Sequence, residues 1–360
     1  MNHISQIQRK LASLNYDAVL LTDEKNQRYA AGFPFTDGFV LVSREKAWLI
    51  TDSRYIEAAE TAAGSCAKIL LYDNSRPKMR VLREILKAEG LENLAAEDRT
   101  LSHAEYLGLE RLLGFALKPV GTMMADLRAS KDEEELRSMV AAQRISEKAL
   151  EETLPFIRPG MTEKEVAAEL VYRMLRNGSE GNSFDPIVVT GRNTSKPHGV
   201  PGDTVLQPGD FVTMDFGSLK DGYCSDMTRT VAVCSATDEM KQVYDTVLRA
   251  QLAGIAAARS GIPGRDIDAA ARKVITDAGF GPYFGHGFGH CLGLDIHEPP
   301  MANPRGEAIM PGNAVSSAEP GIYIPGRFGV RIEDVMILRP DGCEVITKAP
   351  KSELLIVGKD

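Results

Sequence analysis

The first third of the chain alternates short apolar runs with amphipathic stretches of helical length. Each apolar run is bounded by polar or glycine-containing residues, which is typical of strands. Apolar residues three or four positions apart mark the intervening stretches as helices. This alternation predicts a small α/β domain. The predicted strands are residues 17–21, 38–42, 47–50, 68–71 and 115–120, and the predicted helices are residues 54–63, 78–89 and 102–113.

A change of pattern near residues 126–130 predicts a domain boundary. Ser130-Lys131-Asp132-Glu133 has the S-x-x-E form of a capping box, so a new helix is expected to begin there. The same device recurs at Thr162-Glu163-Lys164-Glu165, ahead of a second helix. We therefore predict an N-terminal domain of residues 1–126 and a C-terminal domain of residues 127–360.

Beyond this boundary, helical periodicity alternates with β-rich runs that are joined by tight turns. Long helices followed by antiparallel hairpins indicate an α+β domain in which the helices pack on a curved sheet. The predicted helices begin at residues 130 and 162 and then cover 240–255 and 267–278, and the predicted strand segments are 186–190, 211–230, 314–324 and 329–338.

The segment 211–230 carries one aspartate in each arm of a predicted hairpin. Asp221-Gly222 between the arms is a strong signal for a two-residue turn. With such a turn, Asp215 and Asp226 lie on the same face, opposite or nearly opposite each other. Like charges that face each other across a sheet are destabilising. The pair therefore indicates either a solvated outer face or a cation bound between the acids.

A second pair of acids occupies the strands at 314–324 and 329–338. With an odd-numbered loop centred near Gly326, Glu319 lies opposite Glu333 on the adjacent strand. Apolar and small residues flank both acids, which indicates burial, and an unpaired buried charge is costly. Four carboxylates on two hairpins favour a shared positive partner over four solvated side chains.

Three of the six histidines fall within residues 285–299. His286 and His290 are four residues apart, but the glycines around them make a helix costly. We therefore predict extended backbone with both rings on one face. His297 has the opposite parity and needs a bend, such as one at Gly293, to join them. The glycine spacing does not fit a dinucleotide-binding turn.

Composition narrows the class of protein. A length of 360 residues is enough for about two domains. The net charge of -8 argues against a nucleic-acid-binding surface, and no apolar run approaches the roughly 18 residues of a membrane span. The N-terminal segment lacks the apolar region of a secretory signal. Five scattered cysteines fit reduced thiols, so we predict a cytoplasmic location.

Two aspartates, two glutamates and one histidine from separate strands form a chemically coherent ligand set. Mixed carboxylate and imidazole ligands suit Mn²⁺, Co²⁺, Zn²⁺ or Fe²⁺, and four acids match a centre of two divalent ions. A water that bridges two such ions loses a proton near neutrality and becomes a nucleophile. His198 and His297 are then left for proton transfer and oxyanion stabilisation. The candidate ligands are Asp215, Asp226, His290, Glu319 and Glu333.

The segments around these residues resemble the pita-bread metallopeptidases, most closely the aminopeptidase P and prolidase group. The resemblance rests on MDFG, GYCSDMTRT, GHGFGHCLGLDIHE, EPGIYI and GVRIEDV, and it covers residues from about 130 to 355. It implies a creatinase-type N-terminal domain, a pita-bread catalytic domain and a homodimer. It also implies cleavage between an N-terminal residue and proline in short peptides, with two Mn²⁺ or Co²⁺ ions per subunit and a metal-bridging hydroxide as the nucleophile.

The resemblance also implies roles for individual residues. Asp215 is expected to bind one ion, and His290 and Glu319 the other. Asp226 and Glu333 are expected to bridge the two ions. The implied catalytic residues are His198 and His297, and the implied substrate-binding residues are His286, Tyr323 and Arg331.

Several alternatives share parts of this pattern. An Xaa-Pro dipeptidase needs a cation for the free carboxylate of its substrate, and Arg305 is a candidate. Methionine aminopeptidases share the fold and ligands, and His198-Gly199 resembles their motif, but they usually lack this N-terminal domain. Metal-free creatinase-like hydrolases and binding proteins of this fold tend to lose ligands, whereas all five are present here. A kinase-like reading of Asp215-Phe216-Gly217 fails because no glycine-rich loop is present.

Overall fold

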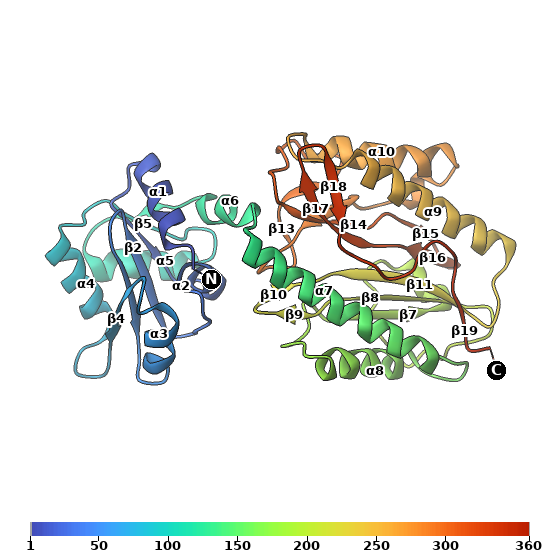
Figure 1. Cartoon of the computed structure of the whole chain (residues 1–360), viewed down its shortest axis with the longest axis horizontal. Coiled ribbons are helices and arrows are strands. Elements are labelled where there is room, and N and C mark those ends of the chain that lie inside the picture. The colour runs from blue at the N-terminus through green and yellow to red at the C-terminus, as the bar shows by residue number, and fades with distance from the viewer. Residues whose placement is uncertain (1, 360) are drawn as a thin grey trace. The chain divides into compact units, whose positions relative to one another are not determined.

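The computed structural model describes residues 2–359 and divides the chain into two units between Arg128 and Ala129. The first unit contains one sheet and the second contains several (Figure 1). Each unit also has its own apolar core. Among the described helices, none combines the length and the apolar character that a bilayer crossing requires.

The first unit is built on one six-stranded sheet in the order β4-β3-β2-β1-β5-β6. β2 runs antiparallel to β1 and β3, and the other neighbouring strands are parallel. Apolar side chains of α4 and α5 pack on this sheet. The bounds are α1 Ile4–Leu14, β1 Ala18–Leu21, α2 Glu24–Ala31, β2 Gly38–Ser43, β3 Ala47–Thr51, α3 Ile56–Ala63, β4 Lys68–Leu71, α4 Lys78–Glu89, β5 Leu94–Ala96, α5 His103–Leu113, β6 Lys118–Pro119 and α6 Met123–Ala129.

Four elements of this unit were not predicted from the sequence, namely α1, α2, β5 and α6. α2 buries Asn26 and Gln27 beside its alanines, so its sequence carries no clear apolar stripe. β5 is only three residues long. The strand predicted at 115–120 is reduced to the two residues of β6.

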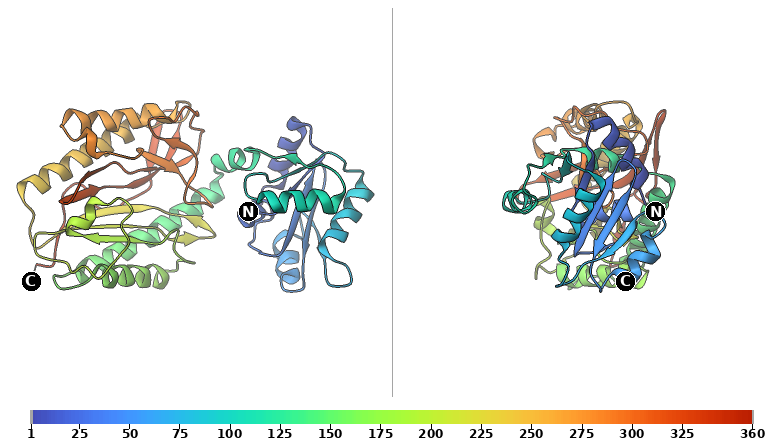
Figure 2. Two further views of the ribbon diagram at one scale, coloured as in Figure 1. Left: turned by 180° about the vertical axis from the view of Figure 1, so that it is seen from behind. Right: turned by 90° about the vertical axis from the view of Figure 1, so that its left-hand side faces the viewer.

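The second unit places two pairs of helices on the outer sides of two sheets (Figures 1 and 2). α7 and α8 pack with the sheet β19-β11-β8-β7, and α9 and α10 pack with β13-β12-β14-β17-β18. The bounds are α7 Glu133–Thr153, α8 Glu163–Arg176, β7 Ile187–Thr190, β8 Phe211–Phe216, β9 Leu219–Lys220, β10 Tyr223–Cys224, β11 Met227–Val233, α9 Asp238–Ala257, α10 Gly264–Asp277, β12 Gly289–Cys291, β13 Glu298–Ala302, β14 Val315–Ala318, β15 Gly321–Ile324, β16 Phe328–Arg331, β17 Asp334–Arg339, β18 Gly342–Val345 and β19 Ile356–Val357.

The N-terminus of α7 is capped by a different residue from the one predicted. Asp132 is the cap, and the Glu135 carboxylate accepts a hydrogen bond from the Asp132 backbone N–H at 2.7 Å. The predicted cap at Ser130 is wrong, because its hydroxyl donates instead to the carbonyl oxygen of Gly312 at 2.7 Å. The capping box predicted at 162–165 is confirmed in α8.

The hairpin formed by β8 and β11 has the predicted register. One continuous register joins β8 to β11 and β9 to β10, and it places Asp221 and Gly222 at the tip. Both tip residues have positive φ, 50° and 74°, as a type I′ turn requires. Asp215 pairs with Thr228, so Asp226 lies diagonally across from Asp215 on the same face of the hairpin.

The second acid-bearing hairpin departs from the prediction at the acids themselves. Each of its two predicted strands divides into two, so that β14 pairs with β17 and β15 pairs with β16. The shared register places Glu319 opposite Glu333, as predicted, but neither residue belongs to a ladder. Instead, the Glu319 N–H donates to the Phe288 carbonyl oxygen at 2.8 Å, and the Glu333 N–H donates to that of Thr228 at 3.1 Å. The ladder between the two strands is therefore interrupted at the two glutamates, whose N–H groups bond to other segments.

Candidate metal centre

The five predicted ligands are held at strand ends and strand interruptions of the second unit. Asp215 lies near the end of β8, Asp226 directly precedes β11, and His290 is in β12. Glu319 and Glu333 occupy the two interruptions described above. All five line one cavity of about 430 Å³. The fold thus brings together side chains from two hairpins and a third pair of strands.

Three of these residues form the tightest group. One ligand atom from each of Asp226, His290 and Glu333 lies within 4.8 Å of the others. His290 Nε2 is 3.6 Å from Asp226 Oδ2 and 3.5 Å from Glu319 Oε1. Asp215 faces the same cavity, where one of its oxygens accepts a hydrogen bond from Arg331.

The His290 ring is oriented with Nε2 toward the acids. Its Nδ1 lies 3.1 Å from the carbonyl oxygen of Cys291, which can only accept, so Nδ1 carries the proton and Nε2 keeps its lone pair. Burial, together with the smaller effect of the neighbouring His297, lowers the pKa of His290 to about 4. The ring is therefore neutral near pH 7, which is the form that binds a metal ion.

The four carboxyl groups outnumber the positively charged side chains beside them, since Arg331 is the one arginine in the described lining. Burial raises the pKa of Asp226 and Glu333 well above the usual carboxyl range, and the neighbouring carboxylates raise it further. Burial also raises the pKa of Glu319 to about 8, against the opposing charge of Arg331. Oδ1 of Asp215 and Oδ1 of Asp226 are buried without a hydrogen-bond partner. This donor set fits divalent cations, which would satisfy these oxygens and favour their ionised forms.

Arg331 connects the acids to the other predicted substrate-binding residues. Its guanidinium donates to the Tyr323 hydroxyl at 2.8 Å as well as to Asp215. The Tyr323 hydroxyl lies 2.9 Å from Nε2 of His286, whose Nδ1 lies 2.8 Å from the carbonyl oxygen of Gly287. Nδ1 of His286 therefore carries the proton, and the Tyr323 hydroxyl donates to Nε2. Burial lowers the pKa of His286 to about 4 and raises that of Tyr323 to about 12.

His198 and His297 line the same cavity from its exposed side. The ring of His297 lies 4.3 Å from that of His290, measured between centroids, at an interplanar angle of 69°. The predicted bend is present, and Gly293 lies in it. The bend extends over residues 292–297 and reverses the chain, so that β12 and β13 pair as an antiparallel hairpin.

Arg305 is not among the residues that line the cavity. Its side chain is exposed. Arg331 is the one arginine in the described lining, and it is hydrogen-bonded to Asp215 and Tyr323. The proposed use of Arg305 for a substrate carboxylate therefore has no support in this geometry.

Thr228 is a site residue that the sequence analysis missed. Its hydroxyl donates to Glu333 Oε2 at 2.7 Å and accepts from Arg331 Nε at 3.1 Å. It follows Asp226 by two positions in a strand, so the alternation that placed Asp226 could also have identified Thr228. The remaining lining residues come mostly from loops and carry no comparable sequence signal; they are Phe184, Asp185, Ile187, Pro197, Gly287, Gly289, Ile296, Met301 and Asn303.

Together, the two-sheet fold and the buried cluster of carboxylates and imidazole define a metal-dependent hydrolase. The chain belongs to metallopeptidase family M24, whose model matches residues 137–340. The creatinase/prolidase N-terminal domain matches residues 3–130. The expected fold class, a creatinase-type domain followed by a pita-bread domain, and the expected class of metal-dependent exopeptidase are confirmed. The family implies divalent metal ions.

Similar proteins match over nearly the whole chain. An Xaa-Pro dipeptidase from Bacillus anthracis has 40% identity and a TM-score of 0.94, covering 98% of this chain and 99% of that structure. An X-Pro aminopeptidase from Thermotoga maritima has 34% identity and a TM-score of 0.92, covering 97% and 100%. The Xaa-Pro dipeptidase of Pyrococcus horikoshii is 34% identical over 341 residues, 93% of each chain.

Proposed function

We propose that this protein removes the N-terminal residue from short peptides that have proline in the second position. The observation that carries the proposal is the set of buried acids and the neutral His290 at one cavity, with orphaned oxygens on Asp215 and Asp226. We infer the specificity for proline from the names of the similar dipeptidase and aminopeptidase. An Xaa-Pro bond has no amide N–H, which removes a donor on which extended-strand recognition of substrates depends.

Five residues would hold two divalent ions, with Mn²⁺ or Co²⁺ as the first candidates and Zn²⁺ or Fe²⁺ as alternatives. Asp215 is proposed to bind one ion, and His290 with Glu319 the other. Asp226 and Glu333 are proposed to bridge them. When bound, such a pair of ions polarises a scissile carbonyl and lowers the pKa of a shared water.

The remaining residues are proposed to position the peptide and to move protons. His198 and His297 lie on the exposed side of the cavity, where either ring can donate to the developing oxyanion or to the departing proline nitrogen. Arg331 holds Asp215 and Tyr323 in place through its guanidinium. The Tyr323 hydroxyl in turn fixes His286, whose neutral ring lines the cavity.

The absence of an uncommitted arginine in the described lining favours an aminopeptidase over a dipeptidase, because a dipeptidase must bind the free carboxylate of its substrate. The dipeptidase is kept as the second candidate because two of the similar proteins carry that name. Rates on Gly-Pro and on Gly-Pro-Ala, each with Mn²⁺ or Co²⁺, separate the two. Comparable or faster cleavage of the tripeptide supports the aminopeptidase, and cleavage of Gly-Pro alone supports the dipeptidase. No cleavage of either peptide contradicts both.

A further inference from the structure

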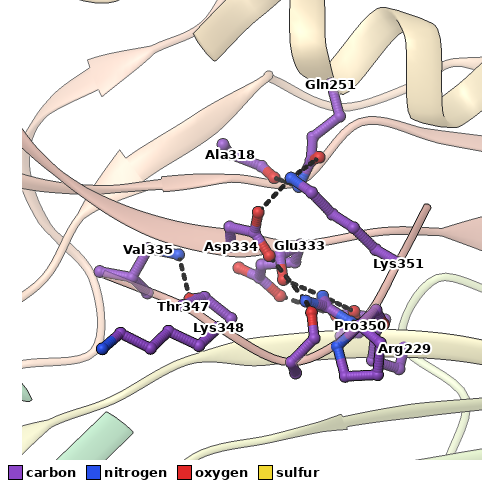
Figure 3. A network of polar contacts seen from close by, with 12 residues as sticks. Arg229, Gln251, Ala318, Glu333, Asp334, Val335, Thr347, Lys348, Pro350 and Lys351 are labelled. Atoms are coloured by element: carbon purple, nitrogen blue, oxygen red, sulfur yellow. Dashed lines mark hydrogen bonds and ion pairs between the residues drawn. The ribbon is translucent and has the colours of Figure 1, made fainter. Parts of the chain in front are cut away.

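Arg229 is a fully buried arginine on the strand that carries Thr228. Its guanidinium donates to the backbone carbonyl oxygen of Glu333 at 2.6 Å and to that of Thr228 at 2.9 Å. It also pairs with Asp334 Oδ1 at 2.8 Å (Figure 3). Both side chains are at most 2% exposed. Arg229 therefore fixes the backbone on both sides of the hydrogen bond between Thr228 and Glu333.

The C-terminal segment supplies the second cation of this cluster. Lys351 Nζ donates to the other carboxylate oxygen of Asp334 and, at 2.6 Å, to Oε1 of Gln251 (Figure 3). The carbonyl oxygens of Ala349 and Pro350 accept hydrogen bonds from Arg229 at 2.8 and 3.1 Å. The segment 349–351 thus contacts the buried Asp334 directly through Lys351, and indirectly through Arg229, which binds both Asp334 and the carbonyl groups of the segment.

Gln251 extends the same cluster to the other glutamate. Its Nε2 donates at 3.2 Å to the carbonyl oxygen of Ala318, the residue before Glu319 (Figure 3). Gln251 is fully buried on α9. One connected set of side chains consequently touches the backbone beside Glu319 and the backbone of Glu333, at the two positions where the ladder between the strands is interrupted.

We propose that Lys351, Gln251, Asp334 and Arg229 form a positioning cluster that sets the separation of Glu319 and Glu333. It carries two positive charges and one negative charge, so it also places a net positive charge behind the acid-rich cavity. The acids repel one another in the absence of cations. The hairpin ladder does not pair the two glutamates with each other, and their N–H groups bond to Phe288 and Thr228, so this cluster adds the link between the two positions. The inference rests on the proposed metal centre and makes the C-terminal segment part of it.

The test compares Mn²⁺ binding by titration calorimetry in the metal-free full-length protein and in single variants. Lys351→Met removes the charge and keeps the length of the side chain, and Gln251→Leu removes the donor to Ala318 with no change in charge. Lys348→Met is the matched control, because Lys348 is exposed in the same segment. Lys351→Arg tests whether a cation restores the effect. The thermal unfolding midpoint without metal is measured for each.

Both cluster variants are expected to weaken binding of at least one Mn²⁺ by 10-fold or more, whereas Lys348→Met stays within two-fold. Lys351→Arg is expected to recover most of the affinity. In the metal-saturated enzyme, the loss is expected in kcat rather than in KM. Wild-type Mn²⁺ affinity in both cluster variants overturns the inference, even where their unfolding midpoint falls, because a purely structural role predicts that result.

The same experiment separates this inference from the proposed function. A wild-type protein that binds Mn²⁺ but cleaves no Xaa-Pro peptide overturns the proposed substrate class and leaves the positioning cluster to be decided by the affinities. A wild-type protein that binds no Mn²⁺, Co²⁺ or Zn²⁺ overturns both.

Discussion

Lys131 and Glu298 form a buried ion pair, with Lys131 Nζ 3.0 Å from Glu298 Oε2 and side-chain exposures of 1% and 5%. The other oxygen of Glu298 accepts a hydrogen bond from the backbone N–H of Asp295 at 3.2 Å. Glu298 directly follows His297 in the chain. The ion pair therefore holds the connection that brings His297 beside His290.

Replacing Lys131 by Met is expected to destabilise the protein by about 3–5 kcal/mol, because a buried carboxylate loses its ammonium partner. Urea unfolding measures this free energy. Lys164→Met is the control, since its pair with Asp203 is exposed and is expected to contribute less than about 1 kcal/mol. Equal effects of the two substitutions would contradict a structural role for the buried pair.

Asp226→Asn is expected to abolish tight binding of at least one metal ion and to reduce activity to background, because an oxygen of Asp226 lies within 4.8 Å of ligand atoms of both His290 and Glu333. Elemental analysis after dialysis gives the metal content. Asp221→Asn in the turn of the same hairpin is the control, since asparagine also accepts the positive φ of that position. Full retention of both metals and turnover in Asp226→Asn would remove the basis of the proposed mechanism.

The metal-free protein is expected to lose stability as the pH rises from about 6.5 to about 8. The folded-state pKa of Glu319, about 8, is above its ordinary value of 4.5, so its proton stabilises the fold at low pH and this contribution disappears as the pH passes the folded-state pKa. His290, whose pKa is lowered to about 4, contributes its own change only below about pH 6.5.

The measurement is the thermal unfolding midpoint against pH, with and without Mn²⁺. Bound cations favour the ionised carboxylates, so the metal-loaded protein is expected to show little change over the same range. A metal-free midpoint that rises between pH 6.5 and 8 would show that the buried acids do not control this dependence.

Tyr323→Phe removes the hydroxyl that joins Arg331 to His286. We expect kcat/KM on an Xaa-Pro peptide to fall about 10- to 100-fold while the metal content is unchanged, as is typical when a residue that orients the groups of a metal site is altered. Tyr283→Phe, at a partly exposed tyrosine outside the cavity, serves as the control. Loss of metal in Tyr323→Phe would instead mean that the hydroxyl supports the ligands themselves.

The sequence predicted the register of both acid-bearing hairpins, because side chains alternate along a strand and the turns at Asp221-Gly222 and near Gly326 set the pairing. It did not predict the interruptions at Glu319 and Glu333. Their backbone N–H groups bond to Phe288 and Thr228, far away in the chain, and no local pattern reports such partners.

Other errors have similarly specific causes. Ser130 and Asp132 both suit a helix cap, and only the contact of Ser130 with Gly312 decides between them. The sequence required a bend to bring His297 to His290, but that this bend is a full reversal depends on the pairing of β12 with β13, which no local pattern reports.

Each acid pair is assembled by its own hairpin, Asp215 with Asp226 and Glu319 with Glu333. Closing contacts between near neighbours in the chain is fast, so each pair is expected to form early during folding. A cation meets a full set of oxygen and nitrogen donors only after the two helix-backed sheets have docked. The time course of Mn²⁺ uptake during refolding is therefore expected to follow the last stage of assembly, and to lag behind the formation of secondary structure.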